Sequence, residues 1–140
     1  MSSWRTGKIS VACSIDIMQR ILLNIAPEWK DRIKIDPAGN LKVNDTRGKK
    51  KCHIVIPAVS YNVSTPNSKS NNYHDIGFIQ KDGKWEVIVM DFYGFNIETE
   101  IQKEFAVQTI KAAARKKKAQ LMVEEDTPKG KRMVLFVPAN

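Results

Sequence analysis

The chain has 140 residues, of which 42% are hydrophobic and 27% charged, and a formal net charge of +8. This length supports one domain with its own core, while 2 cysteines are too few for a disulfide framework or a thiolate zinc site. No apolar run is long enough to span a membrane, and the N-terminus lacks the apolar core of a signal peptide. We therefore expect a cytoplasmic protein that is not secreted, does not bind membranes and carries no cofactor.

The N-terminal part predicts a strand followed by a helix. Residues 8–13 (KISVAC) form the strand. Ser14 is a good N-cap, apolar residues then recur at helical spacing, and Pro27 ends the helix. The sequence thus begins with a β-α unit.

Shorter strands follow. Segments 32–36 and 41–44 alternate apolar and polar residues around a Pro-Ala-Gly-Asn turn, which predicts a hairpin at the edge of a sheet. A basic connection leads into a further strand over 52–59. Residues 60–72 are rich in Ser and Asn and predict a flexible loop.

The strongest local signal is Asp82-Gly83, which favours a type I′ turn between two strands. A two-residue turn fixes the register of the hairpin. Both faces of the hairpin are largely apolar, so we expect it to lie within a sheet that is covered on both sides. The register predicts five opposed pairs: Lys81–Lys84, Gln80–Trp85, Phe78–Val87, Ile76–Val89 and His74–Asp91.

The longest helix follows this hairpin. It can begin after Asn96, or at Thr99 with Gln102 completing a capping box. Acidic residues in the first turns of this helix and basic residues toward its end complement the helix dipole. A terminal hairpin is expected from strands over 121–125 and 133–137. The whole pattern predicts a single α+β domain over 1–140, with a mainly antiparallel sheet, two helices on one face, and a ferredoxin-like relative.

The central segment resembles the plastid and cyanobacterial hypothetical reading frame thirty-five family, a domain of unknown function. Four pieces keep the order and approximate spacing of the family's YDIGF, DGxYE and IxQxYA-like motifs. They are YHDIGF at 73–78, DGKWEV at 82–87, Asp91, and the helical IQ and FA pairs at 101–102 and 105–106.

This chain departs from that pattern. His74 is an insertion, tryptophan and phenylalanine stand at 85 and 105 where tyrosines are usual, and the tail is more basic. The resemblance implies a divergent member with a shared hairpin–helix unit, and it brings no catalytic residues. A viral or phage-borne relative is compatible with this divergence. A plastid stroma or the cytoplasm of an infected host are then the alternative locations.

One group of polar residues is a candidate functional site. His74 should face Asp91 across the central hairpin, with Asp75 adjacent, and a histidine with a carboxylate can form an acid/base pair or half a metal site. A cross-strand polar pair that closes the end of a sheet is the favoured interpretation. No metal site or catalytic residue is predicted, and an enzyme is the least favoured hypothesis.

The basic clusters carry the functional hypothesis. Lysine dominates them, and lysine suits phosphate contact better than the reading of bases. We expect a small non-enzymatic protein that binds nucleic acid or a nucleoprotein. The alternative is an adaptor or inhibitor that docks on a protein, or on a second copy of itself, through an edge hairpin or loop 60–72, with the charge only solubilising. The predicted polyanion-binding residues are Arg47, Lys49, Lys50, Lys51, Lys111, Arg115, Lys116, Lys117 and Lys118.

Overall fold

The protein is described here by a computed structural model, which covers residues 4–43, 50–60, 64, 68–90, 93–116, 120–127 and 130–136. The chain divides into two compact units, Met1–Ile101 and Gln102–Asn140. No helix within the described residues is long and apolar enough to cross a membrane.

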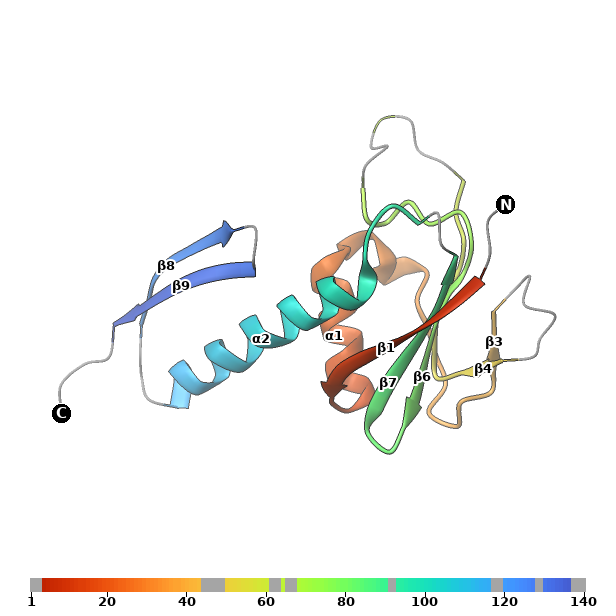
Figure 1. The fold of residues 1–140 in the computed structure, drawn as a ribbon, viewed down its shortest axis with the longest axis horizontal. Coiled ribbons are helices and arrows are strands. Elements are labelled where there is room, and N and C mark those ends of the chain that lie inside the picture. The colour runs from red at the N-terminus through yellow and green to blue at the C-terminus, as the bar shows by residue number, and fades with distance from the viewer. Residues whose placement is uncertain are drawn as a thin grey trace. The chain divides into compact units, whose positions relative to one another are not determined.

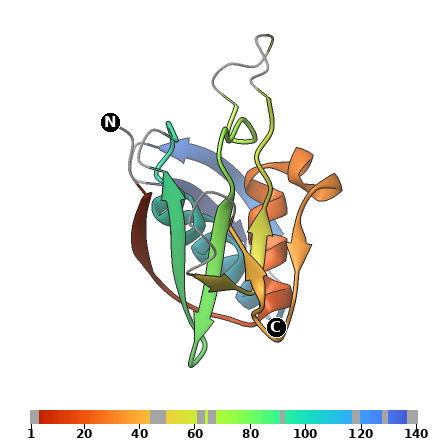
Figure 2. The same cartoon turned by 90° about the vertical axis from the view of Figure 1, so that its right-hand side faces the viewer.

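The first unit is built on a five-stranded antiparallel sheet with the order β1-β7-β6-β5-β2 (Figure 1). Helix α1 (Ile15–Ile25) and a short 3-10 turn, η1 (Pro27–Asp31), carry the chain from one edge strand to the other. In Figure 2 the sheet faces the viewer and α1 lies behind it. The strands are β1 (Trp4–Ala12), β2 (Lys34–Ile35), β5 (Ile54–Ile56), β6 (Ile76–Lys81) and β7 (Lys84–Met90).

This architecture confirms the α+β class and the mainly antiparallel sheet. Helix α1 and the first turn of α2 (Ile97–Lys116) cover the same face of the sheet (Figure 1). Every pair of neighbouring strands in the main sheet is antiparallel, which agrees with the predicted likeness to ferredoxin-like proteins.

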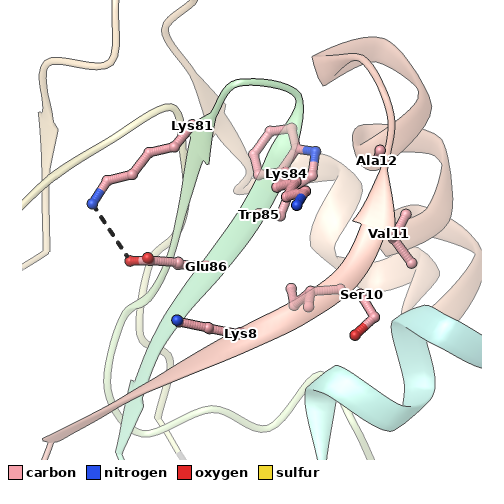
Figure 3. Close-up of a pocket in the computed structure, with 9 residues that line it drawn as sticks. Lys8, Ser10, Val11, Ala12, Lys81, Lys84, Trp85 and Glu86 are labelled. Carbon is pink, nitrogen blue, oxygen red and sulfur yellow. Dashed lines mark ion pairs between the residues drawn. The ribbon is translucent and has the colours of Figure 1, made fainter.

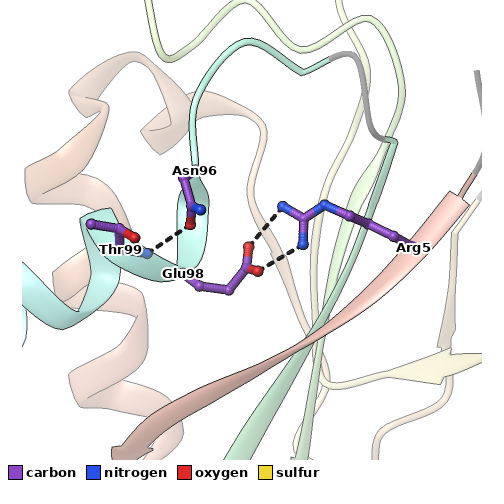
Figure 4. Close-up of polar contacts among 4 residues, drawn as sticks. All are labelled: Arg5, Asn96, Glu98 and Thr99. Carbon is purple, nitrogen blue, oxygen red and sulfur yellow. Dashed lines mark hydrogen bonds and ion pairs between the residues drawn. The ribbon is translucent and has the colours of Figure 1, made fainter.

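Both helices begin where a side chain caps them. The Ser14 hydroxyl accepts a hydrogen bond from the backbone N–H of Ile17 at 3.3 Å, as the sequence predicts. The Asn96 side chain accepts from the N–H of Thr99 at 3.0 Å, so α2 begins at the first of its two predicted starts. Next to this cap, the two terminal guanidinium nitrogens of Arg5 donate to the Glu98 carboxylate at 2.7 and 2.9 Å (Figure 4). This pair ties β1 to the first turn of α2.

The central hairpin has the predicted turn and register. Asp82 and Gly83 adopt φ values of 52° and 78°, as a type I′ turn requires. The pairs Lys81–Lys84, Gln80–Trp85 and Phe78–Val87 are confirmed. The Ile76–Val89 pair lies beyond the described ladder and stays a prediction, as does His74–Asp91, because Asp91 lies outside the described residues.

The predicted edge hairpin between 32–36 and 41–44 is wrong. Strand β2 pairs with β5, whereas β3 (Leu41–Lys42) pairs with β4 (Lys51–Cys52) in a separate two-stranded sheet. The Asp36 carboxylate accepts from the N–H groups of Ala38 and Asn40 at 2.9 and 3.1 Å. These bonds stabilise a turn that sends the chain away from β2 to a second layer instead of back along it.

The predicted strand over 52–59 is divided at His53. Its imidazole Nδ1 accepts from the backbone N–H of Gln80 at 3.0 Å, in place of a backbone partner. The residues before His53 therefore join the small β3–β4 sheet, and those after it join the main sheet. Because Nδ1 accepts a hydrogen bond, the neutral ring carries its proton on Nε2.

The second layer covers the face of the main sheet opposite α1. Its buried side chains meet those of β5, β6 and β7 in one cluster, so the central hairpin is covered on both faces, as predicted. A Cβ atom on Gly77 would lie 2.5 Å from Val43 Cγ2 and 2.7 Å from Cys52 Sγ, so glycine permits this close approach. The cluster contains Val43, Cys52, Val55, Ile79 and Ile88, with Trp4 and Leu41 packed against it.

Part of the Ser/Asn loop is held in place by hydrogen bonds. The side-chain amide of Asn72, which is buried, donates to the carbonyls of Ile56, Pro57 and His74 at 3.1–3.3 Å. The Arg32 guanidinium donates to the carbonyls of Pro57 and Ser70 at 2.6 and 2.9 Å. The end of this loop is thus anchored, while residues 61–63 and 65–67 lie outside the described ones.

The second unit contains the remainder of α2 and a two-stranded antiparallel sheet. Strands β8 (Gln120–Thr127) and β9 (Gly130–Phe136) form it. They confirm the predicted terminal hairpin, and both begin earlier in the chain than the sequence pattern indicates.

Candidate anion-binding face

Strand pairing places three lysines on the face of the main sheet opposite α1. Ile88 marks this face, because its side chain packs in the cluster under β3–β4. Side chains alternate along a strand and opposed residues share a face. Lys8 opposes Glu86, two residues from Ile88, and Lys81 opposes Lys84. All four of these charged side chains therefore lie on the face that Ile88 marks.

These lysines line a groove of about 550 Å³ between β1 and the turn of the central hairpin (Figure 3). The groove lies where the pairing of β1 with β7 is interrupted between Ile9 and Ala12. Such bulges locally end strand pairing and are frequent next to functional sites. Its lining combines the exposed Lys8, Lys81 and Lys84 and the half-buried Glu86 with the buried Ile9, Val11 and Trp85.

A second group of lysines lies on the outer side of β3–β4. Lys42 and Lys51 oppose each other and are exposed, while their neighbours Leu41 and Cys52 point toward the main sheet. Lys50, which immediately precedes β4 in the chain, is also exposed. This second layer covers the same side of the main sheet that carries the groove. We call the six residues Lys8, Lys42, Lys50, Lys51, Lys81 and Lys84 the lysine face.

The charges on this face are poorly balanced. Two lysine pairs, Lys81–Lys84 and Lys42–Lys51, are directly opposed across strands, an arrangement that destabilises a sheet unless counter-charges are present. Lys81 is the member with a counter-charge, because its Nζ lies 3.8 Å from a Glu86 carboxylate oxygen. The other five form no ion pair within the described part of the chain. The lysine face therefore carries an excess of positive charge.

The structure describes part of the predicted polyanion site. Lys50 and Lys51 belong to the lysine face, whereas Arg47 and Lys49 lie outside the described residues. In the second unit, Arg115 and Lys116 are exposed in the last turn of α2 and Lys111 is half-buried one turn earlier. Lys117 and Lys118 lie outside the described residues.

Sequence reasoning missed Lys8, Lys42, Lys81 and Lys84 as site residues. They are isolated lysines within strands, and the predicted sites came from runs of basic residues. The opposition of Lys81 and Lys84 was readable from the Asp82-Gly83 turn. The approach of Lys8 depends on β1 pairing with β7, which no local pattern specifies.

His74 and Asp75, two residues of the candidate polar site, make contacts within the fold. Asp75 is 5% exposed, and its carboxylate accepts from the backbone N–H of Ala58 at 2.8 Å. The His74 ring lies edge-on to Trp4 with 5.9 Å between ring centroids. Within the described residues, no group of three or more His, Cys, Asp or Glu side chains could hold a metal ion.

Neither cysteine is activated as a nucleophile. Burial raises the pKa of the Cys52 thiol to about 11, against the smaller lowering effect of the Lys50 charge. Burial also raises the pKa of the Cys13 thiol, although a hydrogen bond with Trp85 lowers it in part. Reactive cysteines need the opposite shift, because the thiolate is the nucleophile.

The aromatic ring that lines the groove, Trp85, does not offer a stacking platform. Trp85 is 1% exposed, and its indole N–H donates to the Cys13 carbonyl. Tyr93 donates its hydroxyl to the Lys69 carbonyl and packs against Phe95 at 5.8 Å. Bases need exposed rings on which to stack, and the Trp85 ring does not meet this requirement.

Comparison with known protein families, with curated proteins and with solved structures finds no match. The resemblance to the plastid and cyanobacterial family accordingly stays a prediction.

Proposed function

We propose that this protein is a small non-enzymatic binding protein that associates with nucleic acid or a nucleoprotein through the phosphate backbone. One observation carries the proposal: six lysines lie on one side of the main sheet, two pairs of them are directly opposed, and Lys81 alone among the six has an ion-pair partner within the described residues. A bound phosphate backbone would supply that missing negative charge and release condensed counterions. We also propose, from the resemblance described above, that the protein is a divergent member of the plastid and cyanobacterial family.

The chemistry of the face supports backbone contact without base readout. Lysine offers a compact charge and lacks the forked geometry with which arginine reads guanine. Trp85, which lines the groove, is buried, so its ring is not available for stacking on bases. We therefore expect similar affinities for sequences of different composition and a steep dependence on salt.

The test is fluorescence anisotropy with labelled single-stranded RNA and duplex DNA. The variant Lys42→Gln/Lys51→Gln removes two charges from the outer side of β3–β4, where neither side chain is packed. We expect it to weaken binding, while Lys30→Gln, an exposed lysine on η1, does not. Binding that is absent at low salt, or equal weakening by the control, would reject the proposal. The variant Arg115→Gln/Lys116→Gln tests the contribution of α2 separately.

A protein-docking function is the second candidate, and β1 is the feature that favours it. This nine-residue strand is an edge of the main sheet, and within the described residues it pairs with β7 alone. An edge strand can accept a strand from another chain. Docking of this kind would survive moderate salt, and Lys42→Gln/Lys51→Gln would leave it unchanged. A salt-resistant homodimer in sedimentation analysis would support this candidate.

A further inference from the structure

We propose that the groove between β1 and the turn of the central hairpin is a discrete phosphate subsite, in which Lys8, Lys81 and Lys84 hold the anion and Glu86 limits its affinity. This inference deepens the proposed function and rests on it for the identity of the macromolecule. The groove has a binding chemistry of its own, which allows a separate test.

The geometry of the groove distinguishes it from the rest of the lysine face. The three lysines come from three strands, β1, β6 and β7, and line one concavity of about 550 Å³. The register of β1 against β7 shifts between Ile9 and Ala12, and residues of this bulge line the groove next to the charges. Lys42, Lys50 and Lys51 do not line this groove. A phosphate oxygen in the groove could therefore meet several ammonium groups together.

Glu86 is the unusual member of the site. It opposes Lys8 on the neighbouring strand, and its carboxylate lies 3.8 Å from Lys81 Nζ (Figure 3). Without an anion, this carboxylate offsets part of the repulsion among the lysines. When a phosphate binds, the carboxylate becomes a like charge beside it. The side chain thus pairs with Lys81 in the free protein and at the same time weakens anion binding.

This dual role predicts a gain of affinity on substitution. Glu86→Gln keeps the shape of the side chain and removes its negative charge. We expect it to tighten phosphate binding about fivefold, the size of one charge–charge contact in water. Lys8→Gln and Lys84→Gln should each weaken binding by about the same factor. The matched control is Glu28→Gln, an exposed glutamate on η1.

The experiment is an amide chemical-shift titration of isotope-labelled protein with sodium pyrophosphate, against sodium chloride at equal ionic strength. We expect saturable shifts confined to residues 8–12 and 81–86, tighter binding by Glu86→Gln and unchanged binding by Glu28→Gln. Shifts spread evenly over all exposed lysines, or no change in affinity with Glu86→Gln, would overturn the subsite. Circular dichroism of each variant checks that it is folded.

The outcomes separate this inference from the proposed function. If RNA binds with a steep salt dependence but pyrophosphate leaves the groove unchanged, the subsite is wrong and the proposed function stands. If pyrophosphate binds in the groove but RNA and DNA do not bind, the subsite stands as a site for small phosphate compounds and the nucleic-acid function is wrong.

Discussion

The indole N–H of Trp85 donates a hydrogen bond to the backbone carbonyl of Cys13 at 2.9 Å. The Gln80 side-chain amide donates to the same carbonyl at 2.9 Å, and the Cys13 N–H donates to the Gly83 carbonyl at 3.1 Å. Three hydrogen bonds thus fasten the junction between β1 and α1 to the tip of the central hairpin. Trp85 also lines the lysine groove, so this junction fixes the geometry of the proposed subsite.

The first prediction concerns this junction. Gln80→Met keeps the length of the side chain and removes one of the two donors to the Cys13 carbonyl. We expect the free energy of unfolding to fall by about 0.5–1.5 kcal/mol, the usual net value of one hydrogen bond. Urea denaturation measures it, with the exposed Gln102→Met as the control. An unchanged stability of Gln80→Met would show that this bond does not fasten the junction.

The second prediction concerns the contact between the two layers. Gly77→Ala places a methyl group within 2.7 Å of both Val43 and Cys52, so the β3–β4 layer must shift. We expect a loss of about 1–3 kcal/mol in the free energy of unfolding, as overpacked cores show. Gly94→Ala is the control, because nothing lies within 4 Å of its Cβ position. In the double variant with Val43→Ala, the loss of stability should be smaller than the sum of the losses in the two single variants.

The third prediction is a loss of stability in acid. Burial raises the pKa of Glu98, but its hydrogen bonds with Arg5 and the backbone and the charge of Arg5 outweigh burial and hold this pKa below its ordinary value of 4.5. The unfolded chain therefore binds the proton more tightly than the folded chain. The stabilisation is complete above about pH 4.5 and is lost as the pH falls through the lower folded pKa.

Glu98→Gln tests this dependence by urea denaturation between neutral pH and pH 3. At neutral pH the variant should be less stable by about 1 kcal/mol or less, because solvent screens a half-exposed ion pair. The difference from the unsubstituted protein should shrink as the pH falls below the ordinary pKa. A difference that stays constant across this range would contradict the role of the Arg5–Glu98 pair.

The fourth prediction concerns thiol reactivity. Burial raises the pKa of Cys52 to about 11, and its side chain is fully buried, so a disulfide reagent at pH 8 should modify it only when the structure opens. Cys13 is partly exposed and should react first. Peptide mapping over time distinguishes the two. Rapid modification of Cys52 in the folded protein would contradict its place in the cluster between the layers.

Local chemistry made the central elements predictable. Asp82-Gly83 specifies a turn of two residues and hence the register of its strands, and Ser14 and Asn96 mark helix starts by their hydrogen-bonding side chains. The path of the chain after Asp36 was not predictable in this way. A hairpin and a change of layer have the same alternating pattern, and the choice depends on contacts with β5 and β6.

The candidate site was less predictable than the fold. Runs of basic residues are visible in the sequence, but a site that joins Lys8 to Lys84 requires long-range pairing of β1 with β7. The importance of Glu86 likewise follows from its position between Lys8 and Lys81, which are distant from each other in the chain. A count of charges along the sequence does not reveal that a single residue such as Glu86 lies in the candidate site.

The measurement that tests the central claim most directly is the salt dependence of single-stranded RNA binding. For single strands, the logarithm of the binding constant falls against that of the salt concentration with a slope of about −0.7 per neutralised phosphate. The account predicts that Lys42→Gln/Lys51→Gln makes this slope shallower by about 1.4 and that Lys30→Gln leaves it unchanged. An unchanged slope for the double variant, or no binding to RNA at low salt, would contradict the assignment of the lysine face as a nucleic-acid interface.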